Sequence, residues 1–262
     1  MIKKVMTWSP WLVDQYNYVK LLFQILRKFR RKGNPWKVPT TSRDYYNAYD
    51  DKEQRRFAEG KLILCRDGGR NRWLPPSKAT ERYLEPIIRE VEGLLKDRET
   101  ISILEVGCGN CINLTQLKKQ FGSRLKLHGF DISSGRLAVA KKFFGEQLAD
   151  ISLWEESITE PMPKKDIGKY DLVYTMHCLE QIPFAVSQAV EGLWKRAKHR
   201  VVMVEPVWEY ARPVQKLKLV RSDYVRTLLP TVKYLGYNIL RSEPLGFESS
   251  QKNQSSVIVL GK

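Results

Sequence analysis

The residues best placed to do chemistry are two acids and two glycines between positions 105 and 131. Glu105 lies near the end of an apolar run, Gly107 and Gly109 follow it, and a helical pattern comes next. Glycines allow a tight turn and a close approach of backbone to ligand, and the free N–H groups of a helix N-terminus can bind that ligand. Asp131 ends a second apolar run, 26 residues after Glu105, near the spacing at which an acid binds ribose hydroxyls. The pattern predicts a nucleoside-containing ligand.

The elements that must position these residues follow an alternating order after residue 100. Short apolar runs alternate with helical patterns, which predicts a Rossmann-like α/β fold: a doubly wound, seven-stranded, mostly parallel sheet with helices on both faces. Ligands bind such sheets at the carboxyl ends of the strands. The expected strands are Ile101–Val106, Leu125–Phe130, Ile151–Trp154, Asp171–Tyr174, Arg200–Val204, Tyr237–Arg241 and Ser256–Leu260, and the expected helices are Leu114–Phe121, Gly135–Phe144, Phe184–Arg196 and Asp223–Leu235.

The first part of the chain reads differently, as a basic, aromatic-rich extension with helical character. We expect residues 1–77 to form this extension, with a lid over the ligand, and residues 78–262 to form the α/β domain. Lys78–Lys96 has apolar residues at helical spacing, which predicts a helix packed on the sheet. Gly33–Pro39 and Asp67–Pro76 are rich in glycine and proline, which predicts loops.

The segment around the glycine loop resembles the class I S-adenosylmethionine-dependent methyltransferases. That family has an acid-x-Gly-x-Gly-x-Gly loop after its first strand, matched by Glu105, Gly107 and Gly109, with Cys111 replacing the third glycine. Asp131 matches the family's ribose-binding acid. The segment Leu179–Pro183 also resembles the stretch after the fourth strand, which often reads Leu-Glu-His-Ile-Pro. The resemblance covers roughly Lys78 to the end of the chain.

This resemblance implies S-adenosylmethionine as the cofactor and assigns roles to individual residues. Glu105 is expected to contact the ammonium group and Asp131 the ribose. Glu156 is the candidate for the adenine amino group, with Glu155 as the other possible register. Asp44–Asp50 resembles the lid of quinone-methylating enzymes, although it could equally be an ordinary helix. The remaining positions expected to line the cofactor are Gly107, Cys108, Gly109, Ile132, Met176 and Tyr46.

Candidate catalytic and substrate residues come after the fourth and fifth strands. His177 is the one residue in this region whose unperturbed pKa lies near neutrality, so it is the candidate base. It could instead be a structural histidine that shapes the pocket, because methyl transfer depends mainly on orientation and desolvation. Glu205, Trp208 and Tyr210 fall where substrate contacts are expected.

The charge of the chain is the abnormal feature of its composition. Lys and Arg number 45 against 29 Asp and Glu, a net charge of +16, which favours anionic partners. Seven of these charges arise in residues 1–32, and residues 18–32 are amphipathic. This segment could pack on the domain, lie on an anionic membrane surface, or contact nucleic acid or a phosphorylated substrate. Nucleic acid is the weaker choice because no recognised binding module is present.

The cysteines predict neither a metal site nor a disulfide framework. Cys108 and Cys111 have the spacing of a zinc or redox pair, but they lie inside the proposed cofactor loop and have no second pair as a partner. We therefore expect no metal, and a cytoplasmic protein with reduced thiols. Peripheral association with a membrane surface is the alternative that residues 18–32 leave open.

Together these observations predict a methyltransferase acting on a small-molecule or glycan-like acceptor, at oxygen. One alternative is an RNA methyltransferase. Another is a non-catalytic methyltransferase-like module that docks through its basic N-terminus. A nicotinamide dehydrogenase is disfavoured, because Gly107-x-Gly109-x-Cys111 lacks the Gly-x-Gly-x-x-Gly register.

Overall fold

The computed structural model describes residues 10–29, 59–249 and 255–262. The side chains of residues 10–14, 27–29 and 164 are not described. The expected loop Gly33–Pro39 and the expected lid with Tyr46 therefore lie outside the described residues.

A seven-stranded sheet forms the centre of the molecule, with the order β5-β4-β3-β6-β7-β10-β8. The five strands β5, β4, β3, β6 and β7 run parallel, and β10 runs antiparallel to both β7 and β8. The fold class predicted from the sequence is confirmed. The strands are β3 (Ile101–Val106), β4 (Leu125–Asp131), β5 (Ser152–Glu155), β6 (Tyr170–Met176), β7 (Ala197–Glu205), β8 (Ile239–Pro244) and β10 (Ser256–Gly261).

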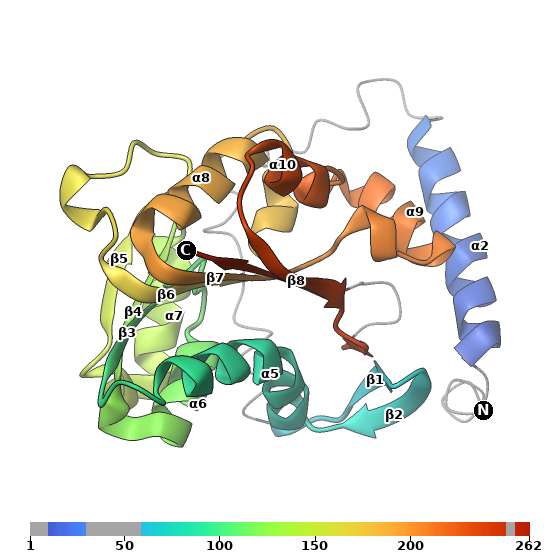
Figure 1. Cartoon of the computed structure of the whole chain (residues 1–262). Helices are drawn as coiled ribbons and strands as arrows, with labels where there is room; N and C mark the ends of the chain where they lie inside the picture. The colour runs from blue at the N-terminus through green and yellow to red at the C-terminus, as the bar shows by residue number, and fades with distance from the viewer. Residues whose placement is uncertain (1–9, 30–58, 250–254) are drawn as a thin grey trace.

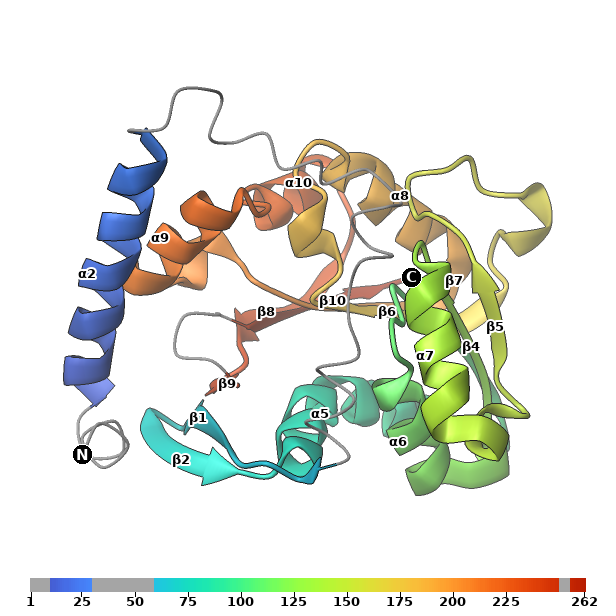
Figure 2. The same cartoon turned by 180° about the vertical axis from the view of Figure 1, so that it is seen from behind.

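Helices cover both faces of this sheet because its central strands are apolar on both sides (Figures 1 and 2). In β3, five of the six residues are buried. One face packs against α5 (Pro76–Leu94), α6 (Ile112–Phe121) and α7 (Ser134–Phe144). The other face packs against α8 (Val186–Arg196) and α10 (Leu228–Tyr234).

Two segments differ from the expectations. The expected loop Asp67–Pro76 belongs to a hairpin of β1 (Ile63–Asp67) and β2 (Arg70–Leu74), which turns at Gly68 and Gly69 with positive φ and pairs through β1 with β9 (Phe247–Glu248). The expected helix Asp223–Leu235 is also wrong at its start: Asp223 ends another helix, α9 (Pro213–Ser222), and α10 begins only at Leu228.

The N-terminal helix α2 (Pro10–Phe29) lies along α9 at one end of the molecule (Figure 1). On this helix Asn17, Leu21 and Ile25 are buried. No helix among the described residues is long and apolar enough to cross a membrane.

Candidate active site

The glycine loop between β3 and α6 is held by its neighbours on both sides. Gly107 and Gly109 have φ values of 73° and 51°. A Cβ atom at Gly107 would lie 2.3 Å from Sγ of Cys178, which follows β6. A Cβ atom at Gly109 would lie 2.5 Å from Nη2 of Arg136, in the first turn of α7. Gly107 is therefore favoured by conformation and by space, whereas Gly109 is favoured by its positive φ, because the guanidinium group of Arg136 can move aside.

Glu105 is buried beneath this loop with one of its carboxylate oxygens lacking a regular hydrogen bond. Oε1 accepts a hydrogen bond from Nδ2 of Asn113 at 2.7 Å, while Oε2 makes no hydrogen bond of regular geometry among the described residues. The hydroxyl of Tyr174, on the neighbouring β6, is the polar group beside Glu105, and its contact lowers the pKa of that carboxyl. Burial raises the pKa of Glu105 to about 8, and the nearby charge of Asp131 adds to that rise. A buried oxygen without a regular hydrogen bond costs free energy, so this atom points to a ligand with a hydrogen-bond donor or a positive charge.

Asp131 connects the end of β4 to the glycine loop. Its Oδ2 accepts from the backbone N–H of Gly109 at 2.8 Å, and its Oδ1 accepts from that of Ser133 at 2.8 Å. The side chain is 5% exposed. Each carboxylate oxygen can accept a second hydrogen bond, so Asp131 keeps the capacity to bind hydroxyl groups. Ile132 is half-buried beside it.

Glu156 is engaged by protein groups. Its Oε2 accepts from Nε1 of Trp154 at 2.6 Å, and its Oε1 forms an ion pair with the buried Arg196. Glu155, the other candidate for the adenine contact, is exposed at the end of β5. The adenine contact stays a prediction.

His177 follows β6 and has both ring nitrogens in polar contacts. Nδ1 lies 3.2 Å from Oε2 of Glu180, and Nε2 lies 3.1 Å from Oγ of Ser255. The ring of Tyr83, on α5, meets the imidazole edge-on at 5.4 Å. The backbone of His177 has a φ of 52° and its N–H donates to the carbonyl oxygen of Val204. The imidazole is thus fixed in position from several elements.

Glu205, at the end of β7, has a structural role that differs from the expected substrate contact. It is fully buried, and its oxygens accept backbone N–H groups of three consecutive residues, Cys178 at 2.9 Å, Leu179 at 3.1 Å and Glu180 at 3.3 Å. Burial raises its pKa to about 7, and the charge of His177 acts in the opposite direction. Glu205 therefore holds the loop that carries His177, and a contact between Glu205 and a substrate stays a prediction.

The other expected substrate residues, Trp208 and Tyr210, lie in the turn after β7. Trp208 is half-buried, with Nζ of Lys216 at 5.1 Å from its ring centroid. The Tyr210 hydroxyl donates to the carbonyl oxygen of Ser242 at 3.0 Å, which ties the turn to β8. Tyr210 therefore has a packing role, and a substrate contact by either residue stays a prediction.

Several residues of the site had no role in the sequence analysis. Glu180 was detectable as an acid three residues after His177. Arg136 had a weaker signal, as a cation in the helix that follows Asp131. The position of Cys178 against Gly107 had none, since it depends on the pairing of β3 with β6.

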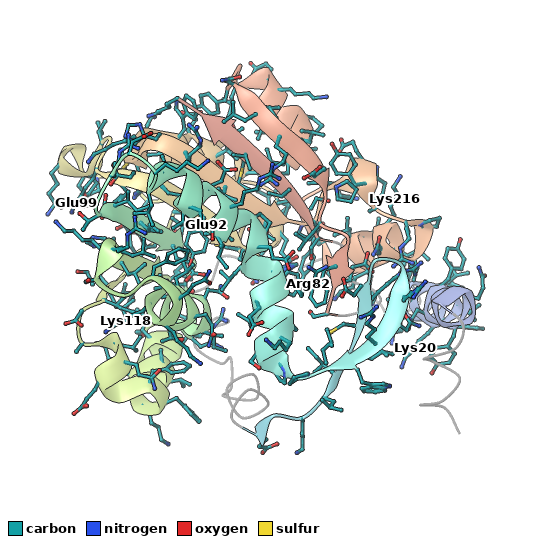
Figure 3. All side chains as sticks on the ribbon, turned by 60° about the horizontal axis from the view of Figure 1, so that its bottom comes forward. Lys20, Arg82, Glu92, Glu99, Lys118 and Lys216 are labelled. Carbon is teal, nitrogen blue, oxygen red and sulfur yellow. The ribbon has the colours of Figure 1, made fainter. Side chains whose placement is uncertain are left out.

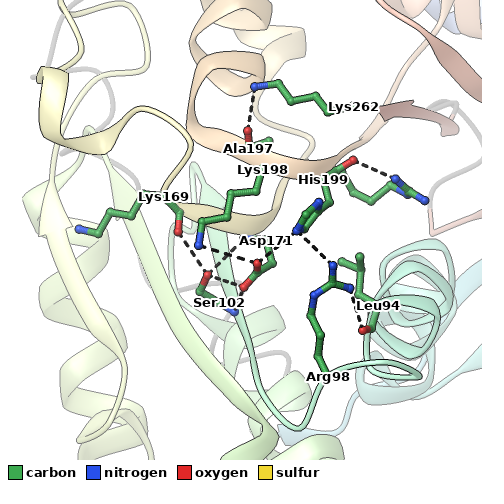
Figure 4. A network of polar contacts seen from close by, with 10 residues as sticks. Leu94, Arg98, Ser102, Lys169, Asp171, Ala197, Lys198, His199 and Lys262 are labelled. Atoms are coloured by element: carbon green, nitrogen blue, oxygen red, sulfur yellow. Dashed lines mark hydrogen bonds and ion pairs between the residues drawn. The ribbon is translucent and has the colours of Figure 1, made fainter.

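A second polar network lies at the opposite ends of these strands (Figure 4). Asp171, at the start of β6, accepts from the backbone N–H and the hydroxyl of Ser102 and lies 3.7 Å from Nε2 of His199. Arg98 contacts the same histidine at 3.3 Å. Burial, and then the charge of Arg98, lowers the pKa of His199. This network links residues at the amino ends of β3, β6 and β7, away from the glycine loop at the carboxyl end of β3.

The carboxyl ends of β3, β4 and β6 thus bring Glu105, Asp131, Met176 and His177 to one edge of the sheet. Oε2 of Glu105 is buried without a regular hydrogen bond, which fits a ligand with a cationic group. The glycine loop at 107–109 has no side chains that would block the approach of the ligand, and Asp131 beside it can accept ribose hydroxyls. S-adenosylmethionine has both. The described residues contain no group of three or more side chains that could hold a metal ion.

Comparisons with known proteins agree with this geometry. Residues 103–200 match the family model described as a methyltransferase domain. The chain is similar in structure to magnesium protoporphyrin IX methyltransferase from Synechocystis PCC 6803 with bound S-adenosylmethionine, at 17% identity and a TM-score of 0.57, over 88% of this chain and 100% of that one. It is also similar to geranyl diphosphate C-methyltransferase from Streptomyces coelicolor A3(2), at 12% identity and a TM-score of 0.53, over 86% of this chain and 98% of that one.

A third similar structure is the [4+2]-cyclase SpnF, at 14% identity and a TM-score of 0.59, over 84% of this chain and 93% of that one. No curated protein matches the sequence. At these identities the structural likenesses show the fold. The match to the methyltransferase-domain model spans Glu105, the glycine loop, Asp131 and His177, so residues 103–200 of this chain form a methyltransferase domain.

Proposed function

We propose that this enzyme methylates a small-molecule acceptor at a hydroxyl oxygen, with His177 as the base. Two of the similar structures are methyltransferases of small molecules, magnesium protoporphyrin IX and geranyl diphosphate. Because these two acceptors differ widely, they support only a small-molecule substrate. The choice of oxygen as the methylated atom is argued from the contacts of His177.

In this proposal Glu105 and Asp131 bind the cofactor. Oε2 of Glu105 receives the ammonium group, and the free acceptor sites on Asp131 receive the ribose hydroxyls. When bound, S-adenosylmethionine supplies an electrophilic methyl carbon, whose bond to sulfur breaks as a bond to the acceptor oxygen forms. Gly107 and Gly109 would let the backbone of the loop approach the bound cofactor closely.

The observation that carries the oxygen acceptor is the arrangement of Glu180, His177 and Ser255. For the neutral imidazole we assign the proton to Nδ1 of His177, where it faces the carboxyl group of Glu180, so that Nε2 carries the lone pair. The Ser255 hydroxyl, at 3.1 Å, then donates to Nε2. A hydroxyl is thus already held in the geometry needed for proton removal at Nε2. We infer that an acceptor hydroxyl replaces Ser255 there and gives up its proton as it is methylated.

Titration calorimetry with S-adenosylhomocysteine tests the cofactor site. Wild type should bind, and Asp131→Ala should bind much more weakly, because the ribose loses its acceptor and the glycine loop loses a hydrogen bond to Gly109. Equal binding by both proteins, or binding by neither, would overturn the cofactor assignment.

A panel of phenols and aliphatic alcohols with labelled S-adenosylmethionine tests the base. We expect His177→Gln to lower kcat most for the alcohols, which hold their protons tightly, and least for acidic phenols. Glu180→Gln should act in the same direction but less, as a positioning residue. His199→Gln, at the opposite end of the sheet, is the matched control. A loss in His177→Gln that is equal for both acceptor types would exclude the base role.

The alternatives predict other results. An RNA methyltransferase would label RNA and bind it with a steep dependence on salt. A non-catalytic module would bind the cofactor and methylate no compound of the panel.

A further inference from the structure

Helix α2 has two different faces. The side toward α9 buries Asn17, Leu21 and Ile25, whose spacing of four residues places them on one stripe. This contact attaches the helix to the enzyme. The buried stripe occupies about a third of the helix circumference. The opposite side of α2 is therefore not covered by this contact.

The opposite face of α2 is apolar and exposed. Tyr16, Val19, Phe23 and Leu26 follow helical spacing and are 63%, 50%, 64% and 50% exposed. Leu22 extends the same face and is 39% exposed. Single exposed apolar side chains are common on proteins, but a continuous stripe of them marks an interaction site.

Positive charge borders this stripe. Lys20 is exposed on α2, with Nζ 5.9 Å from the ring centroid of Tyr16. On α9, which packs against the inner face of α2, Lys216 and Lys218 are half-buried and lie over aromatic rings. Figure 3 shows Lys20 and Lys216 on the same side of the molecule, away from Lys118. The sequence from 15 to 32 contains six Lys and Arg residues and no acid. The partner must therefore be anionic and must offer an apolar layer.

We propose that the outer face of α2 docks on an anionic lipid bilayer, with the helix axis in the plane of the membrane. Cationic amphipathic helices bind in this way, with their apolar side chains between the acyl chains and their cations among the headgroups. The stripe from Tyr16 to Leu26 enters the bilayer, and Lys20 at its border meets the phosphates. The inner face of α2 stays on α9, so the enzyme is held at the membrane without a spanning helix.

Two other occupants fit the surface less well. A second copy would bring together two basic helices on two chains that each carry a charge of +16, which opposes a stable pair. Nucleic acid matches the charge but offers no apolar layer for four aromatic and aliphatic side chains.

Co-sedimentation with vesicles tests the proposal. The full chain should bind vesicles of mixed phosphatidylglycerol and phosphatidylcholine, bind pure phosphatidylcholine much less, and lose binding as salt rises. The double variant Val19→Glu/Phe23→Glu should bind the anionic vesicles about tenfold or more weakly, because it puts two charges into the apolar layer. Lys20→Glu should weaken binding less and reduce the dependence on salt.

The matched control is Ile167→Glu/Tyr234→Glu, which changes two side chains that are 59% and 88% exposed on other parts of the surface. It should bind vesicles like wild type. All variants should bind S-adenosylhomocysteine equally, so failure of docking is distinguishable from failure of the cofactor site. Unchanged binding by the α2 variant, equal binding of neutral vesicles, or a wild-type dimer that this variant dissociates would each overturn the proposal.

Discussion

Two buried glutamates lie at or near the carboxyl ends of two strands of the same sheet and have different roles. Glu105, near the end of β3, accepts one hydrogen bond from Asn113 and leaves Oε2 without a regular hydrogen bond. Glu205, at the end of β7, accepts three backbone N–H groups. Burial raises the pKa of both, to about 8 and about 7. The two side chains are thus equally buried, but the protein donates hydrogen bonds to both oxygens of Glu205 and to only one oxygen of Glu105.

This difference separates a binding residue from a structural one. Glu205 is saturated by the protein and shapes the loop from Cys178 to Glu180. Glu105 has one oxygen, on the side of the Tyr174 hydroxyl, that makes no regular hydrogen bond and can accept a donor from a ligand. The comparison implies that loss of Glu205 should lower the free energy of unfolding, whereas loss of the Glu105 charge should lower ligand affinity and leave the fold intact.

The largest expected effect is on stability, in Glu205→Ala. The variant leaves three buried N–H groups without an acceptor, which should lower the free energy of unfolding by about 3–4 kcal/mol. Urea denaturation measures it. Glu209→Ala, which removes an exposed glutamate nearby, should change stability by less than about 0.5 kcal/mol. Equal stability of the two variants would mean that Glu205 does not hold the loop.

Glu105→Gln should have the next largest effect, on affinity. The amide retains the shape of the side chain and removes the charge that meets the cofactor ammonium, so S-adenosylhomocysteine should bind about 30- to 100-fold more weakly, equivalent to about 2–3 kcal/mol. Calorimetry measures the affinity. Urea denaturation at pH 8 should show that the variant is at least as stable as wild type. A destabilised variant with normal affinity would reverse the roles of the two glutamates.

The pH dependence should distinguish binding from stability. Glu105 holds its proton up to a pKa of about 8 in the free enzyme, and a cationic ligand needs it ionised. Affinity should therefore rise from pH 6 to pH 8, by about tenfold per unit at the lower end, with release of a proton. Calorimetry in buffers of different ionisation enthalpy measures that proton.

Stability of the free enzyme should change in the opposite sense. Between the unfolded pKa of 4.5 and the native value of about 8, the native state binds the proton of Glu105 and the unfolded state does not, so the free energy of unfolding falls as pH rises. Glu105→Gln should abolish most of the pH dependence of binding. An affinity that is flat across this range in wild type would contradict the assignment.

The smallest expected effect concerns Arg136, whose charge lowers the pKa of Glu105. Arg136→Gln should move the midpoint of the affinity profile to higher pH by less than about one unit, because the opposing charge is lost. Arg226→Gln, an exposed change on another part of the surface, should leave the midpoint in place. A shift toward lower pH would contradict the electrostatic contact between Arg136 and Glu105.

Much of the fold was predictable where burial is complete. The bounds of β3 match the apolar run Ile101–Val106, because a central parallel strand is buried on both faces and Gly107 ends it. The hairpin β1–β2 was missed because its strands carry charged residues on exposed positions. Helix α9 was missed because its start depends on local capping, with the Gln215 side chain accepting from the backbone N–H of Arg212.

The candidate site was predictable in its motifs and less so in its contacts. Glu105, the glycines and Asp131 lie within one strand–loop–helix–strand segment, where local spacing is informative. The support of residues 178–180 by Glu205 joins residues 25–27 positions apart across the sheet. Ser255 meets His177 across 78 positions. Such contacts depend on strand order, which hydrophobic periodicity does not report.

The strand order also bears on how the chain folds during synthesis. β10 is made after β8 yet lies between β7 and β8, with every one of its residues buried. Until residues 256–261 have left the ribosome, β7 has an open edge and β8 has no strand to pair with. We therefore expect the domain to complete its sheet only in its last stage of synthesis, and nascent chains that stop before Ser256 to depend on chaperones to protect the edge of β7.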